Sequence, residues 1–260
     1  MDLQLKGKVV LITGGAKGIG AAITHGCARE GGIPVFVDKD ADAAKQLHTE
    51  LRNSGASCAM IPTDLVPAEN CAAAVDQTLR EFGRLDVLVN NVGVNDNVGL
   101  ERGTPEKFVR SLQLNLLHYY NMAHYALSAL KKSHGCIVNI ASKVALTGQG
   151  GTSGYAAAKG AILALTREWA VELLPHGIRV NAVLPAEVMT PLYQQWLSTF
   201  PKPDEKLKQI VSKIPLGKRM TQPDEIASMV LFLISAQASH ITGQHVVVDG
   251  GYVHLDRALT

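Results

Sequence analysis

The stretch that decides the fold class runs Val9-Val10-Leu11-Ile12-Thr13-Gly14-Gly15-Ala16-Lys17-Gly18-Ile19-Gly20. Its β-branched apolar start predicts a buried strand, and its glycines follow the pattern G-x-x-x-G-x-G ahead of a helix. Gly14 permits a tight turn, Gly18 lets the backbone approach a pyrophosphate, and Gly20 lets the helix pack closely on the sheet. The free N–H groups and positive dipole end at Ile19 then favour an anion. This order of strand, turn and helix predicts a dinucleotide site.

An aspartate at the end of the second apolar run, Val35–Val37, bears on which dinucleotide binds. Asp38 falls 18 residues after Gly20. A carboxylate there accepts hydrogen bonds from the adenosine ribose hydroxyls and repels a 2′-phosphate, so NAD is favoured over NADP. Lys17 and Lys39 are nearby cations that weaken this preference, so some use of NADP stays open.

Short apolar runs alternate with helical patterns along all 260 residues. Seven runs are expected to be strands: Val9–Ile12, Val35–Val37, Ala59–Pro62, Val87–Val89, Ile137–Ile140, Arg179–Leu184 and His245–Val248. They are continuous rather than alternating, which is typical of parallel strands covered on both faces. Helices are expected between them, among them Ala72–Phe82, Ser153–Leu174 and one long helix over Thr104–Lys131. The predicted fold is α/β: one Rossmann domain over residues 1–260, a doubly wound parallel seven-stranded sheet with helices on both faces.

One interval breaks the regular alternation of strands and helices. The segment Thr190–Lys213 follows the sixth strand and carries Pro191, Pro201 and Pro203 among polar residues. Ligands of open α/β sheets bind outside the carboxyl ends of the strands. Residues 190–213 are therefore predicted to form a substrate lid within the domain.

Composition and charge exclude several classes of partner. The formal net charge is +2, charged residues make up 18%, and no basic stripe is present, so neither nucleic acid nor an anionic membrane is expected. No apolar run approaches the roughly 20 residues of a bilayer span, and Met1–Lys6 does not resemble a secretory signal. The cysteines, Cys27, Cys58, Cys71 and Cys136, lack metal-ligand spacing. Buried thiols in a reducing, cytoplasmic location are expected, with no metal.

A tyrosine and a lysine four residues apart are candidates for acid/base chemistry. Tyr155 and Lys159 lie in a stretch that favours a helix, so both side chains share one face. A free tyrosine has a pKa near ~10 and is a poor base at neutral pH. A fixed ammonium nearby favours the phenolate and lowers the pKa of the tyrosine. We therefore expect Lys159 to lower the pKa of Tyr155.

Five motifs occur in a fixed order: Thr13–Gly20, Asn90-Asn91-Val92-Gly93, Asn115, Ser142 and Tyr155-x-x-x-Lys159. Together they resemble the short-chain dehydrogenase/reductase family, and the resemblance covers nearly the whole chain. It implies an NAD(P)-dependent oxidoreductase that moves a hydride to or from an alcohol or carbonyl carbon.

The resemblance also implies a role for each matching residue. Ser142 would hydrogen-bond the reacting oxygen, Tyr155 would give or take the proton, and Lys159 would assist Tyr155 and hold the nicotinamide ribose. Asn115 would anchor a water that relays protons, and Asn91 to Gly93 would line the adenosine side. The cofactor-binding residues expected are Gly14, Lys17, Gly18, Ile19, Gly20, Asp38, Lys39, Asp64, Leu65, Asn91, Val92, Gly93, Tyr155, Lys159, Pro185, Val188 and Thr190.

The chain departs from the family pattern after the sixth strand, where Ala186 stands in place of the glycine of a Pro-Gly pair. Alanine visits positive φ at a higher cost than glycine, so the local turn is expected to shift slightly. Glu187 places a carboxylate beside the expected substrate cavity. The substrate-facing residues expected are Asn95, Ser142, Lys143, Gln149, Glu187 and Trp196, with Gln194 considered beside them.

Three substrate classes are open. The polar cavity set favours a sugar or polyol, and Pro185–Tyr193 and the tail Gly251–Arg257 resemble the bacterial sugar dehydrogenases of this family that act on L-fucose. Such enzymes oxidise the anomeric hydroxyl of an aldose to a lactone. A 3-oxoacyl-carrier-protein reductase would use NADPH, which Asp38 and Glu187 disfavour, and a steroid-type dehydrogenase would need a more apolar pocket. A non-enzymatic regulator with this fold is a minor alternative, since the catalytic residues are intact.

Three histidines and the subunit arrangement complete the predictions. His118 and His124 lie six apart, hence on different helix faces, so packing or interface roles are expected for both. His254 could reach the active site of a neighbouring subunit. The family resemblance implies a homotetramer, with helices Thr104–Lys131 and Ser153–Leu174 in one interface and the seventh strand in another.

Overall fold

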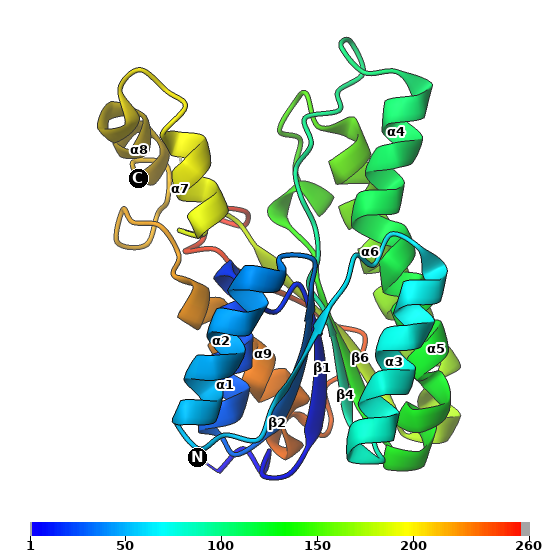
Figure 1. Ribbon diagram of the computed structural model, residues 1–260. Helices are drawn as coiled ribbons and strands as arrows, with labels where there is room; N and C mark the ends of the chain where they lie inside the picture. The colour runs from blue at the N-terminus through cyan, green and yellow to red at the C-terminus, as the bar shows by residue number, and fades with distance from the viewer. Residues whose placement is uncertain (1, 256–260) are drawn as a thin grey trace.

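The computed structural model describes residues 2–255, and within that range seven strands form one sheet. The strands are β1 (Val9–Thr13), β2 (Ile33–Asp38), β3 (Ala59–Pro62), β4 (Val87–Asn90), β5 (Cys136–Ile140), β6 (Arg179–Pro185) and β7 (His245–Val248). All pairings are parallel, in the order β3-β2-β1-β4-β5-β6-β7 (Figure 1). The chain reverses direction across the sheet between β1 and β4, and ligands of such sheets bind in the crevice at that point. The predicted fold class and all seven strands are confirmed.

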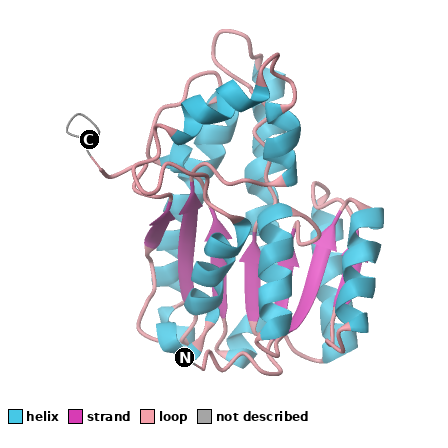
Figure 2. Ribbon diagram, turned by 90° about the vertical axis from the view of Figure 1, so that its left-hand side faces the viewer, coloured by secondary structure: helices cyan, strands magenta, loops and turns pink. Residues whose placement is uncertain are grey.

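Helices cover both faces of the sheet (Figures 1 and 2). On one face lie α1 (Gly18–Arg29), α2 (Ala41–Asn53) and α9 (Pro223–Ile234); on the other lie α3 (Ala68–Phe82), α5 (His118–Ser133) and α6 (Ser153–Glu172). Side chains of β1 alternate between two cores: Val9 and Leu11 face α3, α5 and α6, whereas Val10 and Ile12 face α1, α2 and α9. Because both faces are buried, the strand sequences carry no polar alternation. Three-residue 3₁₀ turns lie at Lys143–Ala145, Leu174–His176 and Ala236–Ala238.

The single long helix expected over Thr104–Lys131 is wrong. The chain forms α4 (Pro105–Leu112), then a π-helical segment over Gln113–Leu117, then α5. The cause is Asn115, which is fully buried in the wide turn. Its amide Nδ2 donates to the Ser111 carbonyl at 3.0 Å, and its Oδ1 accepts from the Val94 N–H at 2.7 Å. A side chain that hydrogen-bonds both to a helix carbonyl and to a loop N–H favours the wider π-helical turn, which holds one more residue than an α-helical turn.

After β6 the chain leaves the sheet and forms α7 (Pro191–Leu197) and α8 (Pro203–Val211). Both lie above the carboxyl ends of the strands, with α4 on the other side of the top of the molecule (Figure 1). They occupy the segment predicted to be a lid, and their movement stays a prediction. Within residues 2–255, no helix is both long and apolar enough to cross a membrane.

Candidate active site

The glycine turn after β1 has the geometry that an anion cradle needs. Gly14 and Gly18 adopt left-handed backbone angles, with φ of +63° and +55°. A Cβ on Gly20 would collide with the carbonyl oxygen of Gly14, so α1 packs against the turn only because residue 20 is glycine. No side chain caps the start of α1, where Lys17 is the N-cap residue. The first N–H groups of α1 are therefore available to a phosphate.

The segment after β4 holds the glycine turn from the other side. Asn91 donates through Nδ2 to the carbonyl oxygens of Thr13 and Gly14, at 3.0 and 3.1 Å. Its own N–H donates to the Thr13 hydroxyl at 2.8 Å. Asn91, Val92 and Gly93 all line the cavity, as expected, and Asn91 additionally fixes the shape of the cradle.

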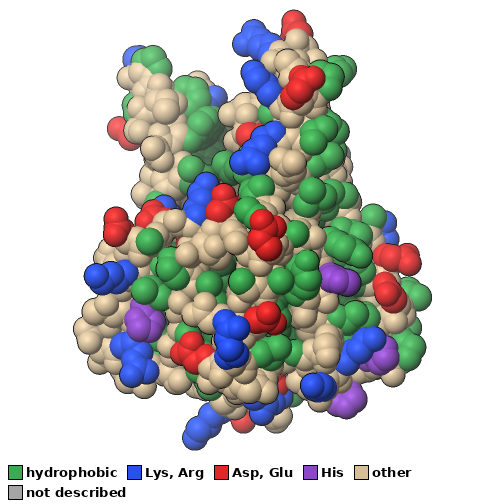
Figure 3. Space-filling model, turned by 45° about the vertical axis from the view of Figure 1, so that its right-hand side comes forward, with side chains coloured by type: hydrophobic (Ala, Val, Ile, Leu, Met, Phe, Trp, Pro, Cys, Tyr) green, Lys and Arg blue, Asp and Glu red, His purple; other side chains and the backbone are tan. Residues whose placement is uncertain are grey.

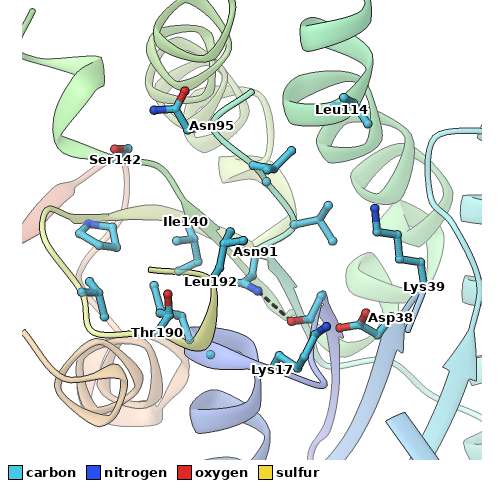
Figure 4. A pocket seen from close by; sticks show the side chains of 18 of the residues that line it. Lys17, Asp38, Lys39, Asn91, Asn95, Leu114, Ile140, Ser142, Thr190 and Leu192 are labelled. Carbon is cyan, nitrogen blue, oxygen red and sulfur yellow. Dashed lines mark hydrogen bonds between the residues drawn. The ribbon is translucent and has the colours of Figure 1, made fainter. Parts of the chain in front are cut away.

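The carboxylate of Asp38 lies at the end of β2, facing the turn (Figure 4). One oxygen accepts from the Ala16 N–H at 3.1 Å and the other from the Asp40 N–H at 3.0 Å. Each oxygen keeps acceptor capacity for a further donor. Lys17, predicted as a free cation that weakens the NAD preference, instead pairs with Asp40 at 2.6 Å, and this hydrogen bond raises the pKa of Lys17.

A cavity of about 600 Å³ runs along the carboxyl edge of the sheet from this turn toward α7. Every expected cofactor residue lines the cavity except Gly20, which lies behind Gly14. Figure 4 shows Lys17, Asp38 and Lys39 at one end, and Asn95 and Ser142 toward the other. The residues that line the cavity therefore extend from the expected dinucleotide site to a second end that carries Asn95 and Ser142.

Ser142, Tyr155 and Lys159 meet at the polar end of the cavity, and all three line it. Ser142 follows β5 and opens a 3₁₀ turn, while the other two residues share one face of α6. Lys159 Nζ is buried and donates to the Ile140 carbonyl at 2.8 Å and the Tyr119 hydroxyl at 3.1 Å. The ammonium is thus held from below, 5.6 Å from the centre of the Tyr155 ring.

Acidities at this end differ from the expectation in one respect. Burial raises the pKa of Tyr155, and a hydrogen bond with Ser142 opposes that shift only in part. Burial also lowers the pKa of Lys159 to about 7. The net shift of the Tyr155 pKa is therefore upward rather than downward as expected, because desolvation of the phenolate is the largest effect. In the same poorly solvated environment a phenolate on Tyr155 and an ammonium on Lys159 attract one another strongly, so the two titrations are coupled.

Asn115 does not line the cavity, although it was expected among the catalytic residues. Both polar atoms of its side chain form hydrogen bonds that accompany the π-helical segment, to the Val94 N–H and to the Ser111 carbonyl. It nevertheless lies beside the centre: a Cβ on Gly93 would be 3.3 Å from Asn115 Oδ1 and 3.1 Å from Lys159 Nζ. Asn115 therefore ties the loop after β4 to the helix beneath Lys159, and its predicted water relay stays a prediction.

The expected substrate residues divide into three groups. Asn95 and Ser142 line the cavity. Lys143 and Glu187 do not line it but form a buried ion pair beside it. Gln149 is exposed in a loop between Gly148 and Gly150, outside the cavity, so its placement there was wrong.

Trp196 was also expected to face the substrate, and this was wrong. Its ring packs edge-on against Tyr193 and Phe200, with centroids 5.1 and 4.9 Å away, and it does not line the cavity. Trp196 lies one turn along α7 from Leu192 and Tyr193, which line the cavity together with Gln195, but its own ring is engaged by Tyr193 and Phe200 instead.

Tyr193 is a site residue that sequence patterns missed. It lines the cavity, and its hydroxyl donates to Glu187 at 2.7 Å. Its place in the predicted lid was the only signal. His118, predicted to pack, is buried at the cavity wall, with Nε2 3.0 Å from the Leu114 carbonyl oxygen.

Other predicted features lie apart from the cavity. Ala186 is not among the described residues with positive φ, so alanine in place of glycine adds no backbone strain there. All four cysteines are buried free thiols. Among residues 2–255, no group of three His, Cys, Asp or Glu side chains could hold a metal. His254 is exposed, whereas Asp256 and Arg257 of the predicted tail motif lie outside the described residues.

The site fits a dinucleotide on its own geometry: a cradle that a Cβ would block, an uncapped helix start and a carboxylate at the end of β2. Fold and site together define an oxidoreductase built around such a cofactor. A family model described as "Enoyl-(Acyl carrier protein) reductase" matches residues 14–253. The chain belongs to the short-chain dehydrogenase/reductase family, whose members are NAD(P)-dependent and act on CH–OH groups.

Three similar proteins illustrate the range within the family. The L-fucose dehydrogenase of Mus musculus is 38% identical over 95% of this chain and 89% of its own length. The crystal structure of Cj0485 dehydrogenase is 46% identical, covers 100% of this chain and 99% of its own, and has a TM-score of 0.96. The L-sorbose reductase of Gluconobacter frateurii, solved with NADPH and L-sorbose, is 27% identical over 98% and 100%, with a TM-score of 0.94. The chain therefore has sugar-oxidising and sugar-reducing homologues.

Proposed function

We propose that this protein oxidises the anomeric hydroxyl of an aldose, L-fucose or a close relative, to the lactone, with NAD as hydride acceptor. The polar end of the cavity carries the proposal. Asn95, Ser142, Tyr155 and Tyr193 offer amide and hydroxyl groups there. Apart from Lys159, the buried charges beside this end, Lys143 and Glu187, pair with one another. Uncharged hydrogen-bonding groups suit a neutral polyhydroxylated substrate, and a polar site rejects ligands that leave its groups unpaired.

The proposed proton transfer uses Tyr155 as base and Ser142 as the group that orients the reacting oxygen. The bound nicotinamide supplies the acceptor for the hydride that leaves the anomeric carbon. The hydroxyl proton passes to the Tyr155 phenolate as the C–O bond becomes a carbonyl. The hydrogen bond between Ser142 and Tyr155 supports this pairing of roles.

Lys159 is proposed to stabilise the Tyr155 phenolate and to pass on its proton. Its pKa of about 7 lets the ammonium and the free amine coexist near neutral pH. Its hydrogen bonds to Tyr119 and Ile140 keep Nζ below the tyrosine ring. Asn115 is proposed to hold the neighbouring loop and a relay water in register with Lys159.

NAD rather than NADP is the proposed cofactor. The Asp38 carboxylate at the end of β2 would meet the adenosine ribose. Of the two lysines at this end of the cavity, Lys17 is paired with Asp40. A 2′-phosphate would therefore meet the Asp38 carboxylate with only Lys39 to offset the repulsion, so NAD is expected to be preferred and NADP to be used less well.

The protein is further proposed to be a cytoplasmic homotetramer in which residues 190–213 close over the substrate. Four buried free thiols support a reducing compartment. Exposed apolar side chains on α4 and α5 support a subunit interface. Only Leu197 of α7 and α8 is buried in the described structure, which supports a segment that moves independently of the sheet.

Initial rates of nicotinamide reduction at mildly alkaline pH test the proposal. NAD and NADP are compared across aldoses, polyols, hydroxysteroids and a 3-hydroxyacyl thioester. NAD-linked turnover on L-fucose or a close aldose is the expected result. Turnover confined to NADP and the thioester would replace the proposal with a carrier-protein reductase, and turnover confined to hydroxysteroids with an apolar-alcohol dehydrogenase.

A further inference from the structure

A buried ion pair lies directly beside the substrate end of the cavity. Lys143 follows Ser142, and its ammonium contacts the Oε1 oxygen of Glu187, two residues past the end of β6. The two side chains are only 10% and 14% exposed. Neither lines the cavity, so the pair is one layer away from a bound substrate.

Every charged atom of this pair already has a protein partner. The second oxygen of Glu187 accepts from the Tyr193 hydroxyl at 2.7 Å. Lys143 Nζ also lies 4.2 Å from the centre of the Tyr252 ring. A buried carboxylate with both oxygens engaged is a fixed acceptor rather than one waiting for a ligand.

The backbone of Glu187 is equally well fixed. Its carbonyl accepts from the Thr221 N–H at 2.9 Å, and the Met189 N–H donates to the Thr221 carbonyl at 2.9 Å. Val188 forms a parallel bridge with Thr221. Glu187 is therefore fixed between the end of β6 and the segment that leads into α9, and Tyr193 is attached to this part of the molecule through it.

Helix α7, in contrast, has few other attachments. Of its seven residues, within a fully described segment, only Leu197 is buried. Tyr193 packs on Trp196 within the same helix and presents its ring to the cavity. The Tyr193–Glu187 hydrogen bond is the polar link between the helix and the sheet.

We propose that Lys143 and Glu187 are positioning residues: Glu187, held by Lys143, fixes Tyr193 and thereby sets where α7 closes the substrate pocket. The inference rests on the proposed function only in taking this end of the cavity as the substrate pocket. Tyr193 is then the residue that touches substrate, and the ion pair acts through it. Two segments far apart in the chain, one carrying Lys143 and the other carrying Glu187 and Tyr193, converge on one phenol, which explains why these two charges are buried beside the cavity without lining it.

Tyr193→Phe is the primary test, with Ser198→Ala as a matched control that removes a hydroxyl from the end of the same helix. Loss of a hydrogen bond to a charged acceptor is expected to raise KM for the alcohol about tenfold and to change kcat much less. Acrylamide quenching of Trp196 fluorescence, measured with NAD alone, reports the position of α7 without turnover. The other tryptophan, Trp169, is 7% exposed and contributes little to quenching. Quenching is expected to rise in Tyr193→Phe and to stay at the wild-type level in Ser198→Ala.

Two variants of the pair separate positioning from substrate contact. Glu187→Leu removes the acceptor and leaves the buried Lys143 ammonium unpaired, so it should raise both KM and quenching. The double variant Lys143→Met with Glu187→Gln removes both charges but keeps an amide oxygen for Tyr193, and should restore both readouts.

Unchanged quenching in Tyr193→Phe would overturn the proposal. So would a double variant that restores quenching but not KM, because the pair would then act on substrate directly. If the wild-type enzyme turned over no sugar, the proposed function would fail. The quenching comparison would still decide whether the ion pair holds α7.

Discussion

Burial disfavours the charged forms of both Tyr155 and Lys159. Because the two groups are also close together, the titration of each depends on the charge of the other. Burial raises the pKa of Tyr155 and lowers that of Lys159 to about 7. With the Lys159 ammonium 5.6 Å from the Tyr155 ring centre, ionisation of one favours ionisation of the other by about 3 kcal/mol at an effective dielectric constant of about 20. Desolvation thus opposes ionisation of either group alone, and the attraction between the phenolate and the ammonium offsets this cost when both are charged.

This coupling predicts the pH dependence of alcohol oxidation. Because Tyr155 must lose a proton to act as base, kcat/KM should fall about tenfold per pH unit below the pKa of the free enzyme. Lys159→Met should move this limb to higher pH by about one to two pH units, since the counter-charge is lost. Lys159→Arg keeps the charge and should move the limb less. Profiles from pH 6 to 10 check this, and a limb that stays fixed in Lys159→Met contradicts it.

His118 predicts a second pH effect, on stability rather than rate. The ring is 1% exposed, and among the described residues its Nδ1 has no hydrogen-bond partner. Burial lowers the pKa of His118 to about 4. The imidazole is therefore neutral when folded but protonated below about pH 6.5 when unfolded. This stabilisation is complete above pH 6.5 and is lost as the pH falls toward 4.

Between pH 7 and pH 5, His118 should cost the wild-type protein about 2 kcal/mol of unfolding free energy. His118→Gln cannot titrate and should show a smaller loss over the same interval, whatever its stability at pH 7. His240 is exposed, so His240→Gln is the control and should behave as wild type. Urea unfolding at the two pH values gives the comparison, and equal losses in all three proteins would rule out this role.

Sequence patterns suggested the reacting groups but not their supports. The family resemblance implied roles for Ser142, Tyr155 and Lys159, and helix spacing placed the last two on one face. Tyr193 has no such signature, because its role depends on a hydrogen bond to Glu187 across two turns of irregular backbone. The Lys17–Asp40 pair was missed for a similar reason: which of two nearby carboxylates takes a lysine is a matter of side-chain geometry.

At the scale of elements, the contact between α1 and the glycine turn allows a sharp comparison of two glycines. Gly20→Ala should lower the melting temperature and abolish cofactor binding, because a Cβ there meets the Gly14 carbonyl. Gly160 lies inside α6 with no atom near its absent Cβ. Gly160→Ala should stabilise the protein by about 0.5–1 kcal/mol, since glycine weakens a helix interior. Thermal unfolding and NAD titration check both, and a Gly20→Ala protein that binds NAD normally would contradict the packing argument.

The junction between β2 and α2 predicts how cofactor choice can be changed. Asp40 caps α2 through the Ala43 N–H at 3.0 Å and also neutralises Lys17. Asp40→Asn keeps an oxygen for the cap while releasing the Lys17 ammonium. The ratio of kcat/KM with NAD to that with NADP should fall about tenfold. Asp42→Asn, two residues further on in the first turn of α2, is the control. An unchanged ratio in Asp40→Asn would show that Asp38 alone sets the preference.

The strands were predictable because both faces of the sheet are buried, so each strand appears in the sequence as a continuous apolar run. Glycines in the loops indicate where these runs end. The helix over Thr104–Lys131 was not, because a π-helical turn adds one residue without changing composition. Its cause, the bond from Asn115 to the Val94 N–H, joins residues 21 apart in the chain. Local periodicity carries no information about such a partner.

For the whole molecule, the prediction that matters is the subunit interface. Val109 on α4, Leu117 in the π-helical segment, and Tyr120 and Tyr125 on α5 are between 39% and 55% exposed. Figure 3 shows hydrophobic side chains running down this side of the molecule. Exposed apolar groups in a row along one side mark a protein contact surface.

Leu117→Lys should therefore dissociate the proposed homotetramer into smaller species, seen by light scattering after size-exclusion chromatography. Leu216 is 69% exposed in the turn that follows α8, so Leu216→Lys is a control for added charge. A wild-type protein that elutes as a monomer would contradict the interface at once. A Leu117→Lys protein that stays tetrameric would place the contact elsewhere.

In the parallel sheet the carboxyl ends of the strands lie on the side of the cavity, and the amino ends lie on the side away from it. Strands β1 to β6 end at the cavity, whereas the first residues join the opposite edge, where the Gly7 N–H donates to the Gly31 carbonyl at 2.9 Å (Figure 1). Tyr252, near the other terminus, packs instead on Lys143 beside the pocket. A linker to an electrode or bead should therefore be attached ahead of Leu3, where it leaves the mouth of the pocket open to the proposed substrate. The same linker placed after Leu255 would crowd the segment proposed to close the pocket.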